Sequence, residues 1–371
     1  MSPAITMIST LQPLLFVSRI TGFYLFTFDS KYLRTCITKL DKICIVLTII
    51  LNTAINFGFL LSNYDPGVHA LAMMKYSLPI LMYVNHLIDI FGMIWIFVKR
   101  NKILKIITNL SEIDEELIKI GAKIDHEGNQ KSLKNLMILL LCCGLTMSVW
   151  CGTVHGLNEY DIDVLFQFFS LWIFLCSLVI YFHFFIGIFA ISQRFHILCE
   201  IFHEILPKNL RKLQSICEIY LQIAEIIFCF KKIYGPLLTL YFGNAFCWLC
   251  LSIFSLAMIT KLQITHICTI FCALLHSCIT IIACFFVVKA AERMNCEKEI
   301  LMRSSYKKMN EFDGNFGFCV KISQLQTQIN DVNMKFSCLF FDINWNFVFK
   351  FFSAGVMYFI ILVQFEKSLT K

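Results

Sequence analysis

The sequence predicts an all-α membrane protein with seven transmembrane helices. Three observations support this fold class: an apolar composition, seven long apolar segments, and basic residues confined to alternate connections. Hydrophobic residues make up 58% of the 371 residues and charged residues only 15%, whereas soluble domains carry roughly 25% charged residues. A mean hydropathy of +0.72 indicates that the chain needs a bilayer around it. We therefore predict one membrane domain covering residues 1–371.

The apolar segments each approach the roughly 20 residues that a helix needs to cross a bilayer. They are separated by stretches that carry the charged residues. The predicted spans are about residues 43–62, 76–98, 135–155, 164–191, 236–259, 264–288 and 346–365.

The basic residues give the predicted orientation. Connections 63–75, 156–163 and 260–263 contain only Lys75 and Lys261, and nearly all other lysines and arginines lie in the remaining connections and the N-terminal segment. Because basic residues stay on the cytoplasmic side, we predict a cytoplasmic N-terminus and an extracellular C-terminus. This orientation is opposite to that of a G-protein-coupled receptor.

The cytoplasmic connections, about 99–134, 193–235 and 289–345, are long and patterned. In 103–120, 213–230 and 322–339, apolar residues recur in alternating steps of three and four, which predicts helices with one apolar stripe. We expect these helices to extend the spans into the cytosol and to pack as a base. The stripes fit either packing within one subunit or assembly between subunits.

The remaining composition excludes several classes. The 18 cysteines show no zinc-ligand spacing, so we predict no metal, and no cofactor is predicted. The segments predicted to lie outside the cell hold almost no cysteine, so we predict no disulfide framework. The net charge of +7 is spread along the chain and predicts no nucleic-acid partner. Scattered histidines form no catalytic pattern, and no enzyme is predicted.

The C-terminal segment FSCLFFDINWNFVFKFFSAGVMYFIILVQF, Phe336 to Phe365, resembles the signature of insect gustatory receptors. That family ends its last helix with Thr-Tyr, five apolar residues and Gln-Phe; Tyr358, Gln364 and Phe365 match, while Met357 replaces the threonine. Weaker resemblances lie at Leu14–Phe26 and Lys231–Leu238.

The resemblance implies a ligand-gated, non-selective cation channel in the plasma membrane of chemosensory neurons. It implies a homotetramer, or a heterotetramer with related receptors, embedded in membrane lipids. The outer part of the last helix would line the pore, and a small-molecule tastant would bind in the outer half of each subunit.

The signature residues share helix faces. Met357, Ile361 and Gln364 fall at i, i+4 and i+7, which is one face. In a ring of four helices, the apolar members would form a constriction and the amides a polar ring. Phe365 would form or flank the gate, and Tyr358 is assigned to packing. The alternative is that Gln364 lies at the lipid–water interface.

Candidate ligand-pocket residues are the aromatic and polar side chains in the predicted outer halves of the spans. Aromatic walls with a few hydrogen-bonding groups suit a small organic ligand, although such residues also form interfacial belts. The candidates are Tyr76, Tyr83, Trp150, His155, Gln167, Trp172, Trp248, Ser252, His266 and Thr269. Lower in the membrane, Asn85, His86 and Asp89 form the densest polar cluster within a span, and we assign it a structural or gating role.

Other functions fit less well. An insect odorant receptor would share the topology, and the Tyr358 and Gln364-Phe365 ending favours the gustatory branch. A G-protein-coupled receptor lacks support because no Asp-Arg-Tyr follows the third span and no Asn-Pro occurs, and a transporter would favour internal repeats. Sugar-tuned relatives often carry Glu directly after the motif Tyr, where this chain has Phe359. A bitter or other non-sugar tastant is therefore the default ligand.

Overall fold

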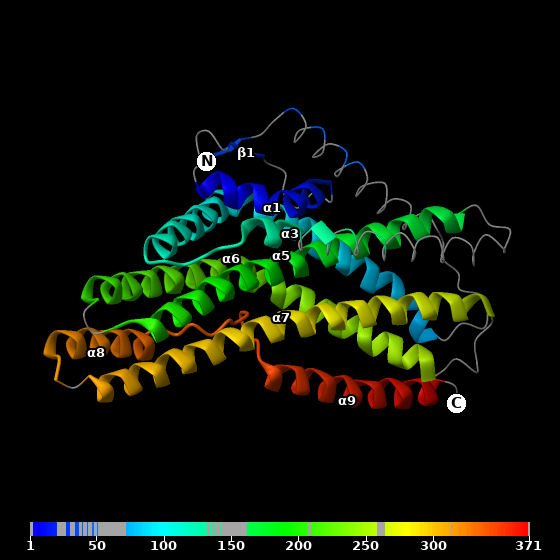
Figure 1. Ribbon diagram of the computed structural model, residues 1–371. Helices are drawn as coiled ribbons and strands as arrows, with labels where there is room; N and C mark the ends of the chain where they lie inside the picture. Colours follow the sequence, from blue (N-terminus) through cyan, green and yellow to red (C-terminus); the bar gives the residue numbers. More distant parts are fainter. Residues whose placement is uncertain are drawn as a thin grey trace.

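The fold is an elongated bundle of long helices, seen in a computed structural model (Figure 1). The structure describes residues 3–20, 27–29, 34–36, 72–131, 162–206, 209–257, 264–312 and 314–369, with single positions between 39 and 50 and between 134 and 142. Side chains at some of these positions are also left undescribed.

Four helices form the body of the bundle. They are α3 (Ala72–Lys119), α5 (Ile162–Glu204), α6 (Leu210–Ala257) and α7 (Ile264–Glu311), of 43 to 48 residues each. At 1.5 Å per residue each is about 65–72 Å long, which is more than twice the roughly 30 Å of a bilayer core. Each helix can therefore cross a membrane and continue well beyond it.

The helices coincide with the predicted segments where the structure describes them. Spans 76–98, 164–191, 236–259 and 264–288 fall almost entirely within α3, α5, α6 and α7, and span 346–365 falls within α9 (Trp345–Leu369). Spans 43–62 and 135–155 lie almost entirely outside the described residues. By length and composition alone, three stretches of the described residues could cross a membrane: Leu178–Glu204, Leu210–Phe254 and Trp345–Phe365.

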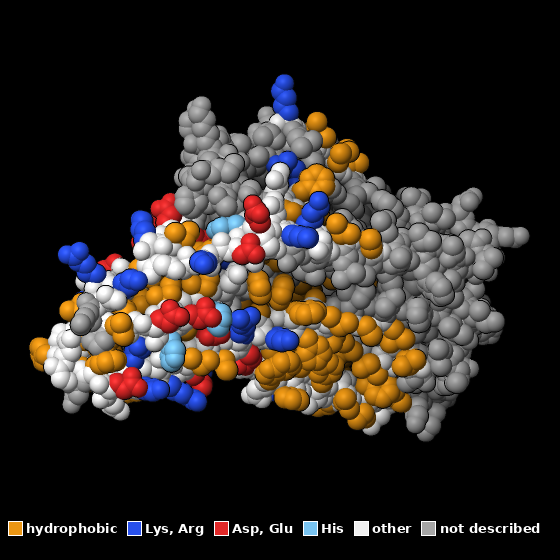
Figure 2. All heavy atoms as spheres, in the orientation of Figure 1, with side chains coloured by type: hydrophobic (Ala, Val, Ile, Leu, Met, Phe, Trp, Pro, Cys, Tyr) orange, Lys and Arg blue, Asp and Glu red, His pale blue; other side chains and the backbone are white. Residues whose placement is uncertain are grey.

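Charged and apolar side chains separate along the bundle. On the face shown in Figure 2, lysines, arginines and acidic residues gather toward the end where α8 lies, and hydrophobic side chains cover the region of α9. This separation matches a bundle with one end in water and the other in lipid.

The core follows the apolar stripes that the sequence predicts. Leu117 of α3, Leu213 and Ile223 of α6, and Ile322 and Leu325 of α8 (Phe316–Asp331) are all fully buried within the subunit. Contacts within one chain therefore account for most of the stripe positions in the base.

The predicted helix over 322–339 is wrong in its second half. Helix α8 ends at Asp331, and Val332 adopts an extended conformation. Residues 332–344, here called the α8–α9 connection, then fold into a tight hairpin in which the Cys338 N–H donates to the Phe341 carbonyl (2.8 Å) and the Ile343 N–H to the Phe336 carbonyl (2.9 Å). The apolar spacing continues through Phe336, but the backbone bonds there are those of a hairpin.

Two lysines hold this connection against neighbouring helices. Lys298 of α7 donates to the Val332 carbonyl and Lys231 of α6 to the Lys335 carbonyl, each at 2.9 Å. Burial lowers the pKa of both ammonium groups from 10.5; neighbouring Lys335 lowers that of Lys298 further, and Asp342 partly offsets the effect on Lys231. The first bond satisfies the carbonyl of Val332, the C-cap residue of α8, and the second satisfies a carbonyl within the hairpin.

The N-terminal part contains helix α1 (Pro3–Ile20), which packs on α3 and α5. A small antiparallel ribbon, β1 (Thr27–Asp29) and β2 (Arg34–Cys36), pairs Phe28 with Thr35. No sequence pattern predicts this ribbon, because three-residue strands are too short to show a period.

Helix α8 begins with a side-chain cap that makes a modest prediction. The Asn315 Oδ1 accepts the Phe318 N–H at 3.2 Å, so Asn315→Ala removes the side-chain acceptor of this amide and leaves it only the Asn315 carbonyl, at 3.1 Å. We expect a loss of about 1 kcal/mol in unfolding free energy, measured by thermal unfolding of purified protein. Asn315→Asp keeps the acceptor and serves as the control; an equal loss in both variants would contradict the capping role.

Candidate functional site

Helix α9 carries the C-terminal signature and is the least packed of the long helices. It lies along one side of the bundle and leads to the C-terminus (Figure 1). Only 11% of its most apolar window is buried, against 67% for the corresponding windows of α5 and α6. Among the described residues its most extensive contact with another helix is with α6, and Phe285 of α7 also packs on Trp345 and Phe352.

The inner face of α9 packs closely on α6. Gly355 is buried in this contact, and a Cβ there would lie at ordinary van der Waals distance from Leu249 and Phe246 (3.7 and 3.9 Å). Phe246 also packs edge to face against Tyr358, with ring centroids 5.6 Å apart. The structure thus places Tyr358, itself half exposed, in a packing contact.

The predicted pore-lining side chains of α9 are exposed, although Phe365 lies two turns after Tyr358 and therefore on nearly the same side of the helix. The exposed fraction is 55% for Met357, 44% for Ile361 and 57% for Phe365, and Gln364 is exposed between them. These four side chains, here called the α9 outer face, were predicted to line a pore. Within the subunit the described residues leave this face uncovered.

The start of α9 is fixed by the α8–α9 connection. The Asn344 Oδ1 accepts the Phe347 N–H at 2.8 Å, and the rings of Phe341 and Phe347 stack with centroids 4.2 Å apart and an interplanar angle of 3°. Phe242 of α6 contacts both rings edge to face. The first turn of α9 is therefore firmly attached, while its outer end has few contacts.

The ligand-pocket candidates divide into three groups. Trp248 and Ser252 are buried on α6, where the Ser252 hydroxyl lies 2.9 Å from that of Ser277 on α7. Tyr83 is half exposed on the surface of α3. The backbones of Tyr76, Gln167, Trp172, His266 and Thr269 are helical but their side chains are outside the described part, and Trp150 and His155 lie outside it entirely.

The polar cluster on α3 is buried against α6. The Tyr241 hydroxyl donates to the Asp89 Oδ1 at 2.6 Å, and the Asn244 Nδ2 donates to the Asn85 Oδ1 at 2.5 Å. Sequence reasoning singled out the α3 residues but missed their partners. The i, i+3 spacing of Tyr241 and Asn244 within a predicted span was the available signal.

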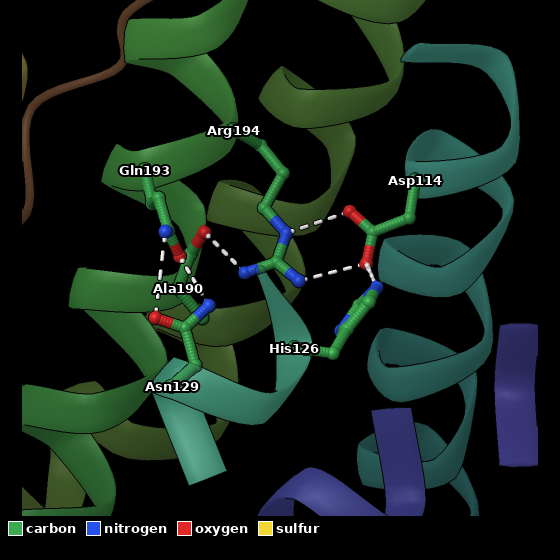
Figure 3. Close-up of polar contacts among 6 residues, drawn as sticks. All are labelled: Asp114, His126, Asn129, Ala190, Gln193 and Arg194. Carbon is green, nitrogen blue, oxygen red and sulfur yellow. Dashed lines mark hydrogen bonds and ion pairs between the residues drawn. The ribbon is translucent and has the colours of Figure 1, made fainter. Parts of the chain in front are cut away.

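A second buried network lies in the predicted cytosolic part (Figure 3). Arg194 of α5 forms a bidentate pair with Asp114 of α3, with Nε–Oδ1 and Nη2–Oδ2 distances of 2.8 and 2.7 Å, and its Nη1 donates to the Ala190 carbonyl at 3.1 Å. Both charged side chains are at most 3% exposed. His126 approaches the Asp114 Oδ2 at 3.7 Å.

The turn after α3 brings that histidine into place. Gly121 has φ 107°, a left-handed conformation that glycine adopts without steric cost. The chain then reverses, so that Asn129 can exchange side-chain hydrogen bonds with Gln193 of α5 (Figure 3). This network links α3, α5 and the turn.

A family model described as "7tm Chemosensory receptor" matches residues 11–369. The chain belongs to this receptor family. The receptor is also similar to the solved structure of the insect olfactory receptor OR5 from Machilis hrabei, with a TM-score of 0.71, 12% identity, and 97% of this chain and 99% of that chain covered. The structure of OR5 in complex with eugenol is similar with a TM-score of 0.63, 14% identity and the same coverage.

These likenesses confirm the predicted fold class, a seven-transmembrane chemosensory receptor embedded in a membrane. Comparison with the sequences of curated proteins gives no match. At 12–14% sequence identity, the solved structures establish only the fold of the receptor.

Proposed function

We propose that the receptor is a gustatory receptor and a subunit of a ligand-gated, non-selective cation channel in the plasma membrane of chemosensory neurons. Its N-terminus is cytoplasmic and its C-terminus extracellular. The observation that carries the proposal is the α9 outer face, where a polar amide at Gln364 stands among exposed apolar side chains near the end of the chain.

Lipid alone does not explain this face. The apolar side chains of Met357, Ile361 and Phe365 are stable in contact with acyl chains. The Gln364 amide is more stable in water or beside a polar partner. If four copies of α9 surround an axis, the apolar side chains form a constriction that water leaves easily, and four Gln364 amides form a neutral polar ring. A neutral ring replaces part of the hydration shell of a cation and discriminates weakly between cations.

The packing of α9 would allow this helix to move when the channel opens. Its base is attached through the α8–α9 connection and the Phe341–Phe347 stack, and its outer end contacts little of its own subunit. A ligand that changes the packing of α6 can therefore shift α9 through Phe246 and Gly355, and neighbouring subunits would complete the pore.

The proposed ligand is a small organic tastant of the bitter or other non-sugar class, because Phe359 follows Tyr358. Buried Trp248 and the Ser252–Ser277 pair provide an aromatic wall and hydroxyl groups of the kind such a ligand uses. An odorant-receptor-type channel is the second candidate, favoured by the similarity to OR5. Eugenol, bound in one of those structures, belongs in the first ligand panel.

The test is whole-cell current in cells expressing the receptor, with a tastant panel, for wild type and Gln364→Ala. We expect a ligand-evoked cation current without G-protein activity, and a change of about twofold in the relative permeability of cations in Gln364→Ala, since the polar ring is lost. Gln324→Ala is the control, because it makes the same chemical change at an exposed position of α8. This variant should leave the relative permeability unchanged.

Two results would count against the proposal. Ligand currents with identical permeability in Gln364→Ala would place this amide at the lipid interface instead of the pore. An epitope tag at Lys371 that is detected only inside the cell would overturn the orientation. Surface labelling in each experiment separates loss of current from loss of protein.

A further inference from the structure

Two turns of helix place four buried polar side chains opposite one another, in the predicted inner half of the membrane. Asn85 and Asp89 on α3 and Tyr241 and Asn244 on α6 are at most 6% exposed. The i, i+4 and i, i+3 spacings put each pair on one helix face, and the two hydrogen bonds between the pairs join the faces. We call these four residues the α3–α6 polar site.

A third helix holds the site in place. The Tyr181 hydroxyl of α5 donates to the backbone carbonyl of Tyr241 at 2.9 Å, and the two rings pack edge to face with centroids 6.0 Å apart. The position of the Tyr241 hydroxyl, and through it the Asp89 Oδ1, is therefore set by three helices.

The site leaves hydrogen-bonding capacity unused. Among the described residues, nothing bonds to the second carboxylate oxygen of Asp89, the side-chain oxygen of Asn244 or the Nδ2 of Asn85. A buried polar atom without a partner costs free energy. Two oxygen atoms and one amide N–H group are thus free to contact a ligand bound between the helices.

The charge of Asp89 restricts the kind of ligand that this site could bind. No lysine or arginine pairs with Asp89 in the described part of the chain, where the Tyr241 hydroxyl is its side-chain partner. An ionised carboxylate in the membrane interior is costly unless a positive charge accompanies it. His86, also buried, stands one turn before Asp89 on α3.

We propose that the α3–α6 polar site binds a monovalent alkali cation together with a water molecule. One carboxylate carries one charge, which a monovalent cation neutralises. The ligands are the unpaired oxygen atoms of Asp89 and Asn244, beside the Tyr241 hydroxyl that donates to Asp89. Hard oxygen ligands bind alkali cations better than they bind softer metals. The Asn85 amide donates to the water that completes the hydration of the cation.

Binding between α3 and α6 would stabilise the contact between these helices. A ligand that binds only the folded protein raises the melting temperature of the protein as the ligand concentration increases. This consequence does not depend on channel activity, so it is testable even if the proposed function is wrong.

The test measures the apparent Tm of the purified full-length receptor in detergent. Sodium or potassium chloride is compared with choline chloride at equal ionic strength. We expect the alkali salts to raise the Tm of the wild type by about 2–4 °C. Asp89→Asn keeps an acceptor for Tyr241 but removes the charge, and its Tm should be the same in all three salts.

The control is Asp331→Asn, which removes the same charge from an exposed position at the end of α8 and should keep the wild-type response. If Asp89→Asn gives no folded protein, Asn244→Ala is titrated instead, and its half-maximal cation concentration should rise at least about fivefold, the effect of losing one oxygen ligand. A wild-type Tm that is equal in choline and alkali salts would overturn the proposal, since water alone, a proton or His86 would then satisfy Asp89. An unchanged response in Asp89→Asn, or an unchanged midpoint in Asn244→Ala, would overturn it as well.

Discussion

Replacing Arg194 by alanine is expected to lower the free energy of unfolding by about 3–5 kcal/mol. The change removes the bidentate pair with Asp114 and the bond to the Ala190 carbonyl. Asp114 would then remain with its side chain 1% exposed, and His126, at 3.7 Å, is too far for a normal hydrogen bond. A buried carboxylate without its partner carries the full cost of leaving water.

The measurement is thermal unfolding of the purified receptor in detergent, where we expect the apparent Tm to fall by about 4–6 °C. Lys105→Ala is the matched control, because it breaks an ion pair with Glu225 whose Nζ–Oε1 distance is 3.1 Å but whose side chains are 61% and 56% exposed. Exposed pairs contribute less than about 1 kcal/mol, so this variant should melt close to wild type. Equal, small shifts in both variants would contradict a stabilising role for the buried pair.

Gly187→Ala is expected to destabilise the receptor by about 1–3 kcal/mol, although glycine to alanine in a helix is usually favourable. A Cβ at Gly187 of α5 would lie 2.3 Å from the Phe230 ring of α6. That ring has little room to move, because Phe184, Tyr234 and Phe336 surround it with centroids 4.5–6.3 Å away.

Gly243→Ala is the control for this change. Gly243 lies exposed in α6, and a Cβ added there would meet nothing within 4 Å, so alanine should raise stability by about 0.5–1 kcal/mol. The double variant Gly187→Ala/Phe230→Leu removes the clashing ring edge and should lose less stability than the sum of its parts. Strict additivity in unfolding measurements would show that the clash is not the cause.

The helices were predictable because apolar periodicity reports burial directly. Leu213 and Ile223 are spaced as a stripe and are fully buried. The same rule failed at the α8–α9 connection, where Val332 and Phe336 continue the spacing of α8 although the helix has ended. The bonds from Lys231 and Lys298 that hold the hairpin come from residues 104 and 34 positions away, and no local pattern contains them.

The candidate site was predictable to a similar degree. Helical spacing placed Met357, Ile361 and Gln364 on one face, and that face is exposed in the subunit. The spacing of residues within one helix does not indicate which partner covers this exposed face. The Asp114–Arg194 pair escaped prediction for another reason: 80 residues separate its members, and many other charges could have paired with either.

The lysine contacts at the predicted cytosolic end have a consequence for how this chain can change over evolution. Lys231, Lys298 and Lys308 bond to the backbone carbonyls of Lys335, Val332 and Ile205, not to their side chains. A carbonyl is present whatever amino acid occupies its position, so those three positions can accept substitutions without losing the bond. For the bond itself the constraint falls on the lysines, although Ile205 is also held by its burial in the core. Relatives are therefore expected to diverge most freely at exposed Lys335 while retaining a long basic side chain at position 231.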